Sequence, residues 1–272
     1  MITGHTRLAA VLGWPVEHSR SPQLLNAAFA ATHLDAVLVP ISVAPEGLAA
    51  VVAGLRAMTA LGASVTVPHK VDVAALCDEL APSARAIGAV NCLQLDDGRL
   101  VGHNTDEAGF TDSLAAAGFD LRGKRVVILG AGGAARAVAY GVRGGRAVEV
   151  IARREVTWAP AWPWTAENLR DVFERADLVV DTTPTGLGTE GEAAFVDALP
   201  LASLRPTAWV ATLVYHRATL LLERAKARGL AILDGRGMLV HQGARAFTIW
   251  TGEPAPIDVM TRALDAAITS SS

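Results

Sequence analysis

The chain has 272 residues, a formal net charge of −3 and a pI of about 6.2, and its basic residues form no block, so the sequence indicates neither nucleic-acid binding nor attachment to an anionic membrane surface. Hydrophobic residues make up 51% of the chain and the mean hydropathy is +0.33, which excludes a disordered chain and allows a sizeable core. No apolar run approaches the roughly 20 residues of a membrane span, and the N-terminus lacks a signal-peptide pattern. Cys77 and Cys92 make no disulfide framework, so we expect a cytoplasmic protein with both thiols reduced.

The first part of the chain alternates short apolar runs with helical patterns. Strands are expected at residues 8–13, 36–43 and 62–67, and helices at residues 21–34, 44–58 and 68–80. Ser21 is expected at the N-cap of the first helix and Pro22 in its first turn. This alternation predicts an open, mostly parallel sheet.

The third strand leads into Ser64–Lys70, SVTVPHK, which holds one of only three lysines among the 24 basic residues; the others are Lys124 and Lys226. An arginine guanidinium stays protonated at any working pH, whereas a lysine ammonium can release its proton when its surroundings tune it. Lys70 is therefore a candidate proton-transfer group. The alternative is an ordinary surface lysine at the start of a helix.

A second α/β pattern begins near residue 105. Strands are expected within 124–129 and at 147–154, 177–186, 207–215 and 230–235, and helices at 105–119, within 130–142, at 167–176, at 218–229 and from 237 onward. The sequence predicts an α/β protein of two domains, a substrate domain of residues 1–104 with an open, mostly parallel sheet and a Rossmann-type dinucleotide-binding domain of residues 105–239. The C-terminal helices, residues 240–272, are expected to pack back on the first domain.

A tryptophan-rich stretch at residues 155–166 interrupts this alternation. It holds Trp158, Trp162 and Trp164 among two prolines, so the crossover helix after the 147–154 strand is expected to be missing or very short. We expect the three rings to cover a sheet face left bare. The alternative is that a ring stacks on the adenine of a cofactor.

A glycine-rich turn follows the strand within 124–129 and fits the pattern G-x-G-x-x-G/A. The turn consists of Gly130, Ala131, Gly132, Gly133, Ala134 and Ala135. The first glycine permits a tight turn, the second lets the backbone approach a pyrophosphate, and the small last residue allows close strand–helix packing. The helix that follows supplies N–H donors and a positive dipole end. The sequence predicts dinucleotide binding here.

The end of the next strand indicates which dinucleotide is bound. NAD enzymes usually place Asp or Glu there to hold a ribose hydroxyl, whereas this chain has Ala152, Arg153 and Arg154. Two guanidinium groups suit the 2′-phosphate of NADP, so we predict NADP(H) as the cofactor. Glu149 within the strand and Glu155 just beyond it leave NAD as an alternative.

Six segments, in order along nearly the full chain, resemble motifs of the shikimate dehydrogenase family. They are GWPVEHSRSPQLLN (13–26), SVTVPHK (64–70), IGAVNC (87–92), GHNTDEAG (102–109), GAGGAAR (130–136) and GRGMLVHQGARAF (235–247). Each motif is modest alone, but six in the family's order are specific. The resemblance implies reversible NADPH-dependent reduction of 3-dehydroshikimate to shikimate, in aromatic amino-acid biosynthesis.

The resemblance also implies which residues bind the substrate and the cofactor. Ser19 and Ser21 would bind the substrate carboxylate, and the ring hydroxyls would contact Ser64, Thr66, Asn91, Asp106, Tyr215 and Gln242. Leu213 and Gly237 would join the glycine turn and residues 152–154 in binding the cofactor. Each of these polar residues taken alone is equally well explained as a turn or cap residue.

Lys70 and Asp106 are the expected catalytic pair. They lie in separate motifs, and in the family such a pair flanks the reacting hydroxyl. Lys70 would protonate the C3 oxygen as hydride arrives, and Asp106 would bond the same hydroxyl and orient Lys70. His18 and His69 are less favoured alternatives, and the sequence shows no metal-ligand spacing.

Several positions depart from the family pattern. The family usually has Asn at Ser64 and Ala152, Thr at Arg154, Asp at Thr212 and Pro at Arg217. Most of these departures fall in the nucleotide domain, so cofactor preference is less firmly predicted than substrate chemistry. The alternatives are an NAD-using quinate/shikimate dehydrogenase and a non-catalytic paralogue that binds shikimate or nucleotide. The expected partners are these small molecules, and the chain is expected to be a monomer or a homodimer.

Overall fold

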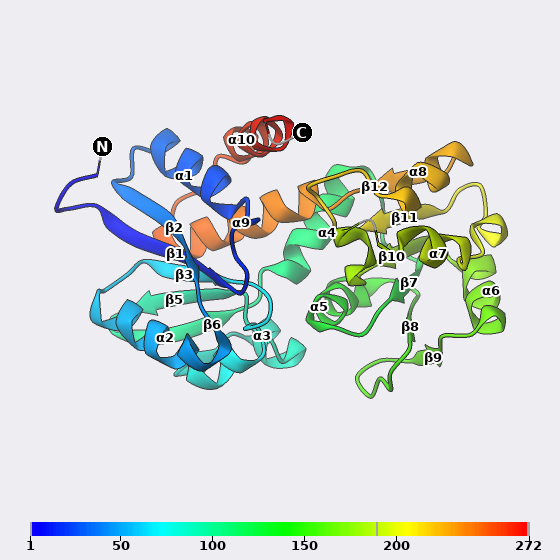
Figure 1. The fold of residues 1–272 in the computed structure, drawn as a ribbon, viewed down its shortest axis with the longest axis horizontal. Helices are drawn as coiled ribbons and strands as arrows, with labels where there is room; N and C mark the ends of the chain where they lie inside the picture. The colour runs from blue at the N-terminus through cyan, green and yellow to red at the C-terminus, as the bar shows by residue number, and fades with distance from the viewer. Residues whose placement is uncertain (1, 189, 271–272) are drawn as a thin grey trace. The chain divides into compact units, whose positions relative to one another are not determined.

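A computed structural model describes residues 2–188 and 190–270 and divides the chain into two compact units (Figure 1). Unit 1 comprises residues 1–109 and 239–272, and unit 2 comprises residues 110–238. Each unit has its own sheet, with helices on both faces. The chain therefore leaves unit 1 after Gly109 and returns to it at Leu239.

Unit 1 is built on a six-stranded sheet with the order β2-β1-β3-β5-β6-β4. Its strands are β1 (Arg7–Gly13), β2 (Ala36–Ser42), β3 (Gly62–Val65), β4 (Glu79–Leu80), β5 (Cys92–Asp96) and β6 (Arg99–His103). The pairings β1–β2, β1–β3 and β4–β6 are parallel, whereas β5 runs antiparallel to β3 and β6. The prediction of an open, mostly parallel sheet is confirmed.

Alternate residues of β1 face two separate hydrophobic clusters, as the period of two of a strand requires. Ala9 and Val11 pack with the helices α1 (Ser21–Ala31), α9 (Arg236–Thr251) and α10 (Ile257–Thr269). Ala10 and Leu12 pack with α2 (Leu48–Ala57) on the other face. Figure 1 shows α1, α9 and α10 on one side of the sheet and α2 on the other.

Two local predictions for unit 1 are wrong. Ser21 is the first residue of α1, and Arg20 occupies the N-cap position. Residues 68–80 form turns, a short 3-10 helix (Asp72–Leu76) and β4, with no α-helix. In this segment the apolar residues Val73, Leu76 and Leu80 pack on the core at helical spacing, but its last two residues pair with β6, so tertiary pairing overrides the local helical pattern. A third helix, α3 (Pro82–Ile87), follows it.

Unit 2 has a fully parallel six-stranded sheet with the order β12-β11-β10-β7-β8-β9. Its strands are β7 (Arg125–Leu129), β8 (Ala147–Ala152), β9 (Ala161–Pro163), β10 (Leu178–Asp181), β11 (Trp209–Thr212) and β12 (Ala231–Leu233). The helices α4 (Asp106–Ala116) and α5 (Gly133–Gly141) pack on one face through Phe110 and Val138. The helices α6 (Ala166–Arg175), α7 (Glu192–Asp197) and α8 (Leu220–Ala227) cover the other. The prediction of a Rossmann-type sheet is confirmed.

The tryptophan-rich stretch forms a loop and the edge strand β9 without a crossover helix, as predicted. Its rings do not share one sheet face. Trp158 packs against the α5 side and Trp164 against the α6 side, while the indole N–H of Trp162 donates to Glu149 Oε1 at 3.1 Å. The three rings therefore close the edge of the sheet from both sides.

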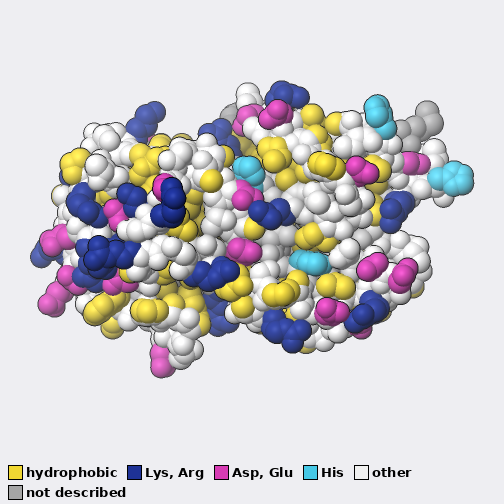
Figure 2. Space-filling view, turned by 180° about the vertical axis from the view of Figure 1, so that it is seen from behind, with side chains coloured by type: hydrophobic (Ala, Val, Ile, Leu, Met, Phe, Trp, Pro, Cys, Tyr) yellow, Lys and Arg dark blue, Asp and Glu magenta, His cyan; other side chains and the backbone are white. Residues whose placement is uncertain are grey.

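No helix in the described part of the chain is both long enough and apolar enough to cross a membrane. Figure 2 shows one face of the molecule, on which Lys and Arg side chains are interspersed with Asp and Glu. No extended field of one sign covers that face.

Candidate functional site

The polar residues expected to bind substrate in unit 1 come from one edge of its sheet. Ser19 and Ser21 follow the carboxyl end of β1, Lys70 follows that of β3, and Asp106 follows that of β6. Because β5 runs in the opposite direction, Asn91 precedes it at the same edge. In α/β sheets, ligands bind outside the carboxyl ends of the strands, so the topology gathers these side chains where a ligand is expected.

Lys70, Asp106 and Asn91 form a connected polar group. The Lys70 ammonium lies 2.6 Å from Asp106 Oδ2, and the Asn91 amide donates to Asp106 Oδ1 at 2.8 Å. The Asn91 amide also donates to Thr105 Oγ1 at 2.9 Å and lies 3.5 Å from Gln242 Oε1. The side chain of Asp106 is 8% exposed, whereas that of Lys70 is 22% exposed, so Lys70 is the more solvent-exposed partner of the pair.

Backbone hydrogen bonds fix the positions of these side chains. The Val90 N–H donates to Lys70 O at 2.7 Å, and the Asn91 N–H donates to His103 O at 3.0 Å. The Asp106 N–H donates to Asn104 Oδ1 at 3.2 Å. These bonds join three separate strand ends, so Lys70 and Asp106 are held together by the sheet rather than by the ion pair alone.

Gln242 reaches the group because α9 lies very close to the start of α4. A Cβ atom at Gly109 would lie 2.7 Å from Gln242 N and 2.9 Å from its Cα, so only glycine fits at this position. Both residues belong to unit 1. The GHNTDEAG segment therefore supplies Asp106 and, through its final glycine, the room for Gln242.

The other expected substrate residues of unit 1 lie nearby in the fold but outside this hydrogen-bonded group. Ser64 is buried on β3 opposite Cys92, which belongs to the α1–α9 side of the sheet. Thr66 follows β3 and donates its N–H to Leu12 O at 2.8 Å. The Ser19 hydroxyl accepts from the Ser21 N–H at 3.3 Å at the start of α1. No described hydrogen bond connects these four hydroxyl groups to Lys70 or Asp106 within residues 2–188 and 190–270.

The two histidines considered as alternatives differ in environment. His69 is fully buried, and its Nε2 lies 2.7 Å from Val43 O, which is typical of a structural histidine. His18 is exposed. Among the residues that the structure describes, no three His, Cys, Asp or Glu side chains come together as they would around a metal ion.

In unit 2 the glycine-rich turn follows β7 and leads into α5. Gly130 has a φ of +108°, which favours glycine, and a Cβ there would lie 2.8 Å from Thr182 Oγ1. Gly132 is the N-cap of α5, and a Cβ at Gly132 or Gly133 would meet no atom within 4 Å. The turn thus leaves open space at a helix N-terminus, which suits a pyrophosphate group.

The two arginines after β8 point in different directions. Arg154 donates to the carbonyl of Ala131 in the glycine-rich turn. The Arg153 guanidinium lies 5.2 Å from the centroid of the Trp164 ring. The two guanidinium groups, which were expected to bind the same phosphate, therefore lie in two distinct environments. Ala152 is buried at the end of β8.

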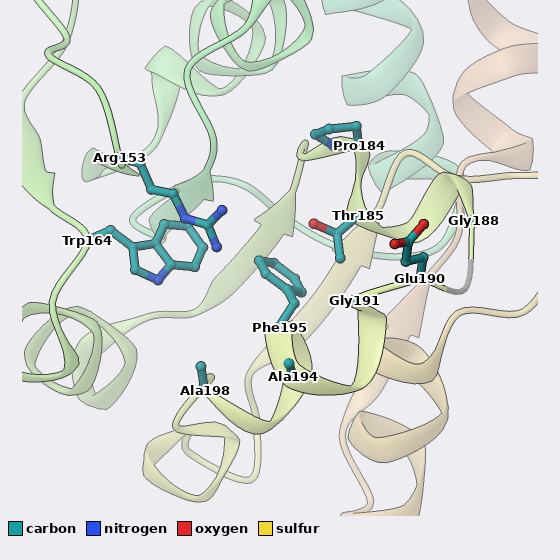
Figure 3. Close-up of a pocket in the computed structure, with 10 residues that line it drawn as sticks. All are labelled: Arg153, Trp164, Pro184, Thr185, Gly188, Glu190, Gly191, Ala194, Phe195 and Ala198. Carbon is teal, nitrogen blue, oxygen red and sulfur yellow. The ribbon is translucent and has the colours of Figure 1, made fainter.

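Arg153 and Trp164 line a cavity of about 480 Å³ (Figure 3). Figure 3 shows Arg153, Trp164 and Phe195 together at one part of the cavity, with Pro184, Thr185 and Glu190 at another. The rings of Trp164 and Phe195 have centroids 5.7 Å apart. The cavity therefore combines a flat aromatic wall with one guanidinium group.

Three further expected residues lie along the same edge of the unit 2 sheet. Leu213 and Tyr215 follow β11, and Gly237 is the second residue of α9 after β12. A Cβ at Gly237 would lie 2.9 Å from Ser113 Cβ, which indicates close helix packing. The rings of Tyr215 and His216 meet edge to face, with centroids 5.8 Å apart.

Thr212, where the family has Asp, is buried and its hydroxyl accepts from the Val214 N–H at 3.3 Å.

A buried carboxyl group ends β10 in unit 2. Asp181 is 3% exposed and accepts from the Thr183 N–H at 2.9 Å. The pKa of Asp181 is raised to about 6, chiefly by burial and also by the charge of Glu192, while the hydrogen bonds from Thr183 partly oppose this rise. Asp181 precedes the Pro184–Thr185 segment of the cavity.

Sequence reasoning missed several residues that the structure brings to these sites. Thr105 binds Asn91 through both its N–H and its hydroxyl, although it stands beside Asp106 in a segment already singled out. Pro184, Thr185 and Phe195 line the cavity with Arg153. The sequence did offer a signal for Pro184 and Thr185, because they follow a buried strand, and loops after parallel strands lie at the edge of the sheet where ligands bind.

Comparisons with known proteins find relatives over the full length of the chain. The family model for the shikimate dehydrogenase substrate binding domain matches residues 11–93. The model for the shikimate 5′-dehydrogenase C-terminal domain matches residues 235–264. A shikimate dehydrogenase (NADP(+)) of Moorella thermoacetica is 43% identical, over 100% of this chain and 97% of that protein.

Solved structures resemble the whole fold. A shikimate 5-dehydrogenase from Listeria monocytogenes, in complex with shikimate and NAD, is 36% identical with a TM-score of 0.86 and covers 96% of this chain and 97% of its own. A 5-ketofructose reductase of Gluconobacter sp. strain CHM43 is 33% identical with a TM-score of 0.83, over 97% of this chain and 100% of its own. The second of these proteins is named for a different substrate from the first.

Proposed function

Because the chain belongs to the shikimate dehydrogenase family, we propose that it catalyses the reversible NADPH-dependent reduction of 3-dehydroshikimate to shikimate. The observation that carries this proposal is the ion pair of Lys70 with Asp106, supported by Asn91 at the ligand edge of the unit 1 sheet.

We assign proton transfer to Lys70. Reduction of the C3 ketone adds a hydride to carbon and a proton to oxygen, so an acid must stand beside that oxygen. The Lys70 ammonium donates this proton from Nζ and becomes a neutral amine, which takes a proton from solvent through its exposed part. In the reverse direction the amine accepts the hydroxyl proton.

Asp106 and Asn91 keep the Lys70 ammonium in place. One Asp106 oxygen binds the ammonium while the other accepts from the Asn91 amide, so the carboxylate cannot rotate freely. In this proposal Asp106 also accepts a hydrogen bond from the reacting hydroxyl. Asn91, Thr66, Ser64, Tyr215 and Gln242 bind the ring hydroxyls, and Ser19 and Ser21 bind the carboxylate at the start of α1, where backbone N–H groups favour an anion.

The residues of unit 2 fit a dinucleotide. The open space over Gly132 and Gly133 admits a pyrophosphate, and the N–H groups of residues 130–134 can bind it. Bound NADPH supplies the hydride. Ala152, Arg153 and Arg154 stand where the adenosine 2′-phosphate is expected, and Leu213 and Gly237 complete the proposed contacts.

The proposed division of labour follows from these positions. Residues 1–104 and 240–272, together with Asp106 and Tyr215, bind and protonate the substrate, and the remainder of residues 105–239 binds NADP(H). We place the enzyme in the cytoplasm, in aromatic amino-acid biosynthesis; the free thiols of Cys77 and Cys92 support a reducing compartment.

The deciding experiment is a set of steady-state rates with shikimate and quinate, each with NADP and NAD. We expect the highest kcat/KM for shikimate with NADP. A higher value for quinate with NAD would replace this proposal by the catabolic alternative. A parallel reduction of 5-ketofructose tests the activity of the Gluconobacter relative. Tight shikimate binding without hydride transfer with either nucleotide would indicate a non-catalytic paralogue.

A further inference from the structure

A second cavity in unit 2 lies at the edge of the sheet opposite the glycine-rich turn. β7 begins at Arg125 and ends at Leu129, just before Gly130, so the two features lie at opposite ends of one strand. The cavity has a volume of about 390 Å³. We call it the basic cavity, because its lining includes the side chains of Arg122, Lys124, Arg125, Arg146, Arg175 and Arg205.

The basic cavity concentrates positive charge in a chain that is acidic as a whole. The net charge of the chain is −3, yet six of its 24 basic residues line this one cavity. Two acidic residues, Glu174 and Asp177, share the lining. A quarter of the basic residues of the chain therefore lie around one cavity.

Three of the six cations have close carboxylate partners. Arg122 lies 2.8 Å from Asp120, Arg175 lies 2.8 Å from Glu149, and Arg205 lies 3.0 Å from Asp177. These pairs hold the walls of the cavity together.

The other three cations are poorly neutralised. Lys124 lies 4.0 Å from Asp177, and Arg125 lies 3.9 Å from Glu149. Each of these carboxylates already binds another arginine more closely, so it neutralises Lys124 or Arg125 only in part. Within residues 2–188 and 190–270, the structure shows no ion pair for Arg146. Excess positive charge therefore faces the cavity.

The backbone forces two of these cations to be neighbours. The Arg146 N–H donates to Lys124 O at 2.7 Å, because the two residues precede the adjacent parallel strands β7 and β8. A Cβ at Gly145 would lie 2.8 Å from the same carbonyl, so the two segments are in close contact. Like charges held side by side repel each other, and an anion between them relieves that repulsion.

We propose that the basic cavity binds a small ligand that carries a phosphate or diphosphate group, at a place separate from the dinucleotide. Guanidinium groups match the geometry of phosphate oxygens, and lysine adds a compact point charge. A volume of about 390 Å³ suits a small molecule rather than an extended polyanion. Lys124, Arg125 and Arg146 are the binding residues, and the paired arginines form the walls.

The test is binding of inorganic phosphate and inorganic pyrophosphate to the full chain, by calorimetry and thermal shift, with sulfate at matched ionic strength as the reference. We expect pyrophosphate or phosphate to raise Tm more than sulfate does. The double variant Lys124→Ala/Arg146→Ala should bind at least about tenfold more weakly, because two charge-assisted contacts are lost. Since neither side chain has a close ion pair and the two charges repel each other, the Tm of this variant without ligand should be no lower than that of the parent.

The matched control removes two exposed cations from the same unit, Lys226→Ala/Arg228→Ala, and should leave binding unchanged. Arg153→Ala should also leave it unchanged, since that residue lines the other cavity. Equal loss in both double variants would reduce the effect to general charge screening and overturn the site. Unchanged binding in Lys124→Ala/Arg146→Ala, with loss in Gly132→Ala or Arg153→Ala, would assign the binding to the dinucleotide site and overturn the proposal, as would unchanged binding in every variant or no binding at millimolar pyrophosphate.

Discussion

Asn91 donates one amide group to Asp106 at 2.8 Å and to Thr105 at 2.9 Å, so a buried side chain holds the carboxylate that pairs with Lys70. This relationship depends on strand direction. Because β5 is antiparallel, its first residues lie at the same sheet edge as the ends of β3 and β6. A parallel fifth strand would have placed Asn91 at the opposite edge.

The role of Lys70 can be tested by removing its exchangeable proton. Lys70→Ala should keep shikimate affinity within a few-fold and lower kcat by roughly 10²–10⁴-fold, the usual contribution of acid–base catalysis. Lys70→Arg keeps the charge near Asp106 but cannot release a proton, so it should be nearly as slow. Steady-state kinetics and substrate calorimetry supply both values. An unchanged kcat in Lys70→Ala would refute the assignment.

The different directions of the two arginines after β8 predict unequal roles. Arg153→Ala should reduce the preference for NADPH over NADH by about 10–100-fold, because a charge-assisted contact to the 2′-phosphate is lost. Arg154→Ala should change the preference by less than about threefold, since its guanidinium binds the Ala131 carbonyl. The ratio of kcat/KM for the two nucleotides measures both. Equal losses would mean that Arg154 turns to the phosphate when cofactor binds.

Two glycines of the turn should respond differently to the same substitution. Gly132→Ala places a methyl group in open space, so Tm should hold while KM for NADPH rises about tenfold, because the backbone can no longer approach a pyrophosphate. Gly130→Ala should cost about 1–3 kcal/mol of unfolding free energy, given its φ of +108° and the nearby Thr182. Thermal unfolding and NADPH titration separate the two effects. An unaltered KM in Gly132→Ala would contradict the proposed pyrophosphate position.

Asp181 should make stability depend on pH. Its pKa is about 6 in the folded chain against an ordinary value of 3.8, so the folded state binds more protons in that window and stability falls as pH rises from about 4 to 6. The penalty persists above pH 6 and is on the order of 2–3 kcal/mol. Asp181→Asn keeps the acceptor for Thr183 and should therefore be more stable than the parent at pH 8, and no more stable at pH 4.

Urea denaturation of the two proteins at both pH values measures this difference. Asp96→Asn, which changes an exposed carboxylate at the end of β5, is the matched control and should show little difference at either pH. The same gain for Asp181→Asn at pH 4 and pH 8 would show that burial of the Asp181 charge is not the cause.

The sequence predicts the strands and the glycine-rich turn well because their signals are local. A buried apolar run such as Val126–Leu129, followed at once by Gly130, has few alternative structures. The β5–β6 hairpin was missed, although Asp97 and Gly98 both have positive φ and such a pair is a strong hairpin signal. The helix predicted at 68–80 failed because tertiary pairing of β4 with β6 overrides weak local preference.

The candidate site is only partly readable from the sequence. Lysine rarity and motif order pointed to Lys70 and Asp106, but the bond from Asn91 to Asp106 depends on the direction of β5, which no local pattern encodes. Likewise, Arg153 and Arg154 look equivalent in the sequence. Their separation follows from the ring of Trp164 and the carbonyl of Ala131, which come from distant segments.

The scarcity of lysine gives the chain a built-in set of chemical reporters. An amine-reactive reagent would modify few side chains, and the three lysines occupy three different environments: Lys70 in an ion pair, Lys124 beside the basic cavity and Lys226 on an exposed helix. Mass spectrometry of partially labelled protein would then follow all three positions at once. Protection of Lys70 by shikimate and of Lys124 by pyrophosphate, with Lys226 as the internal reference, would report on both proposed sites without any substitution in the chain.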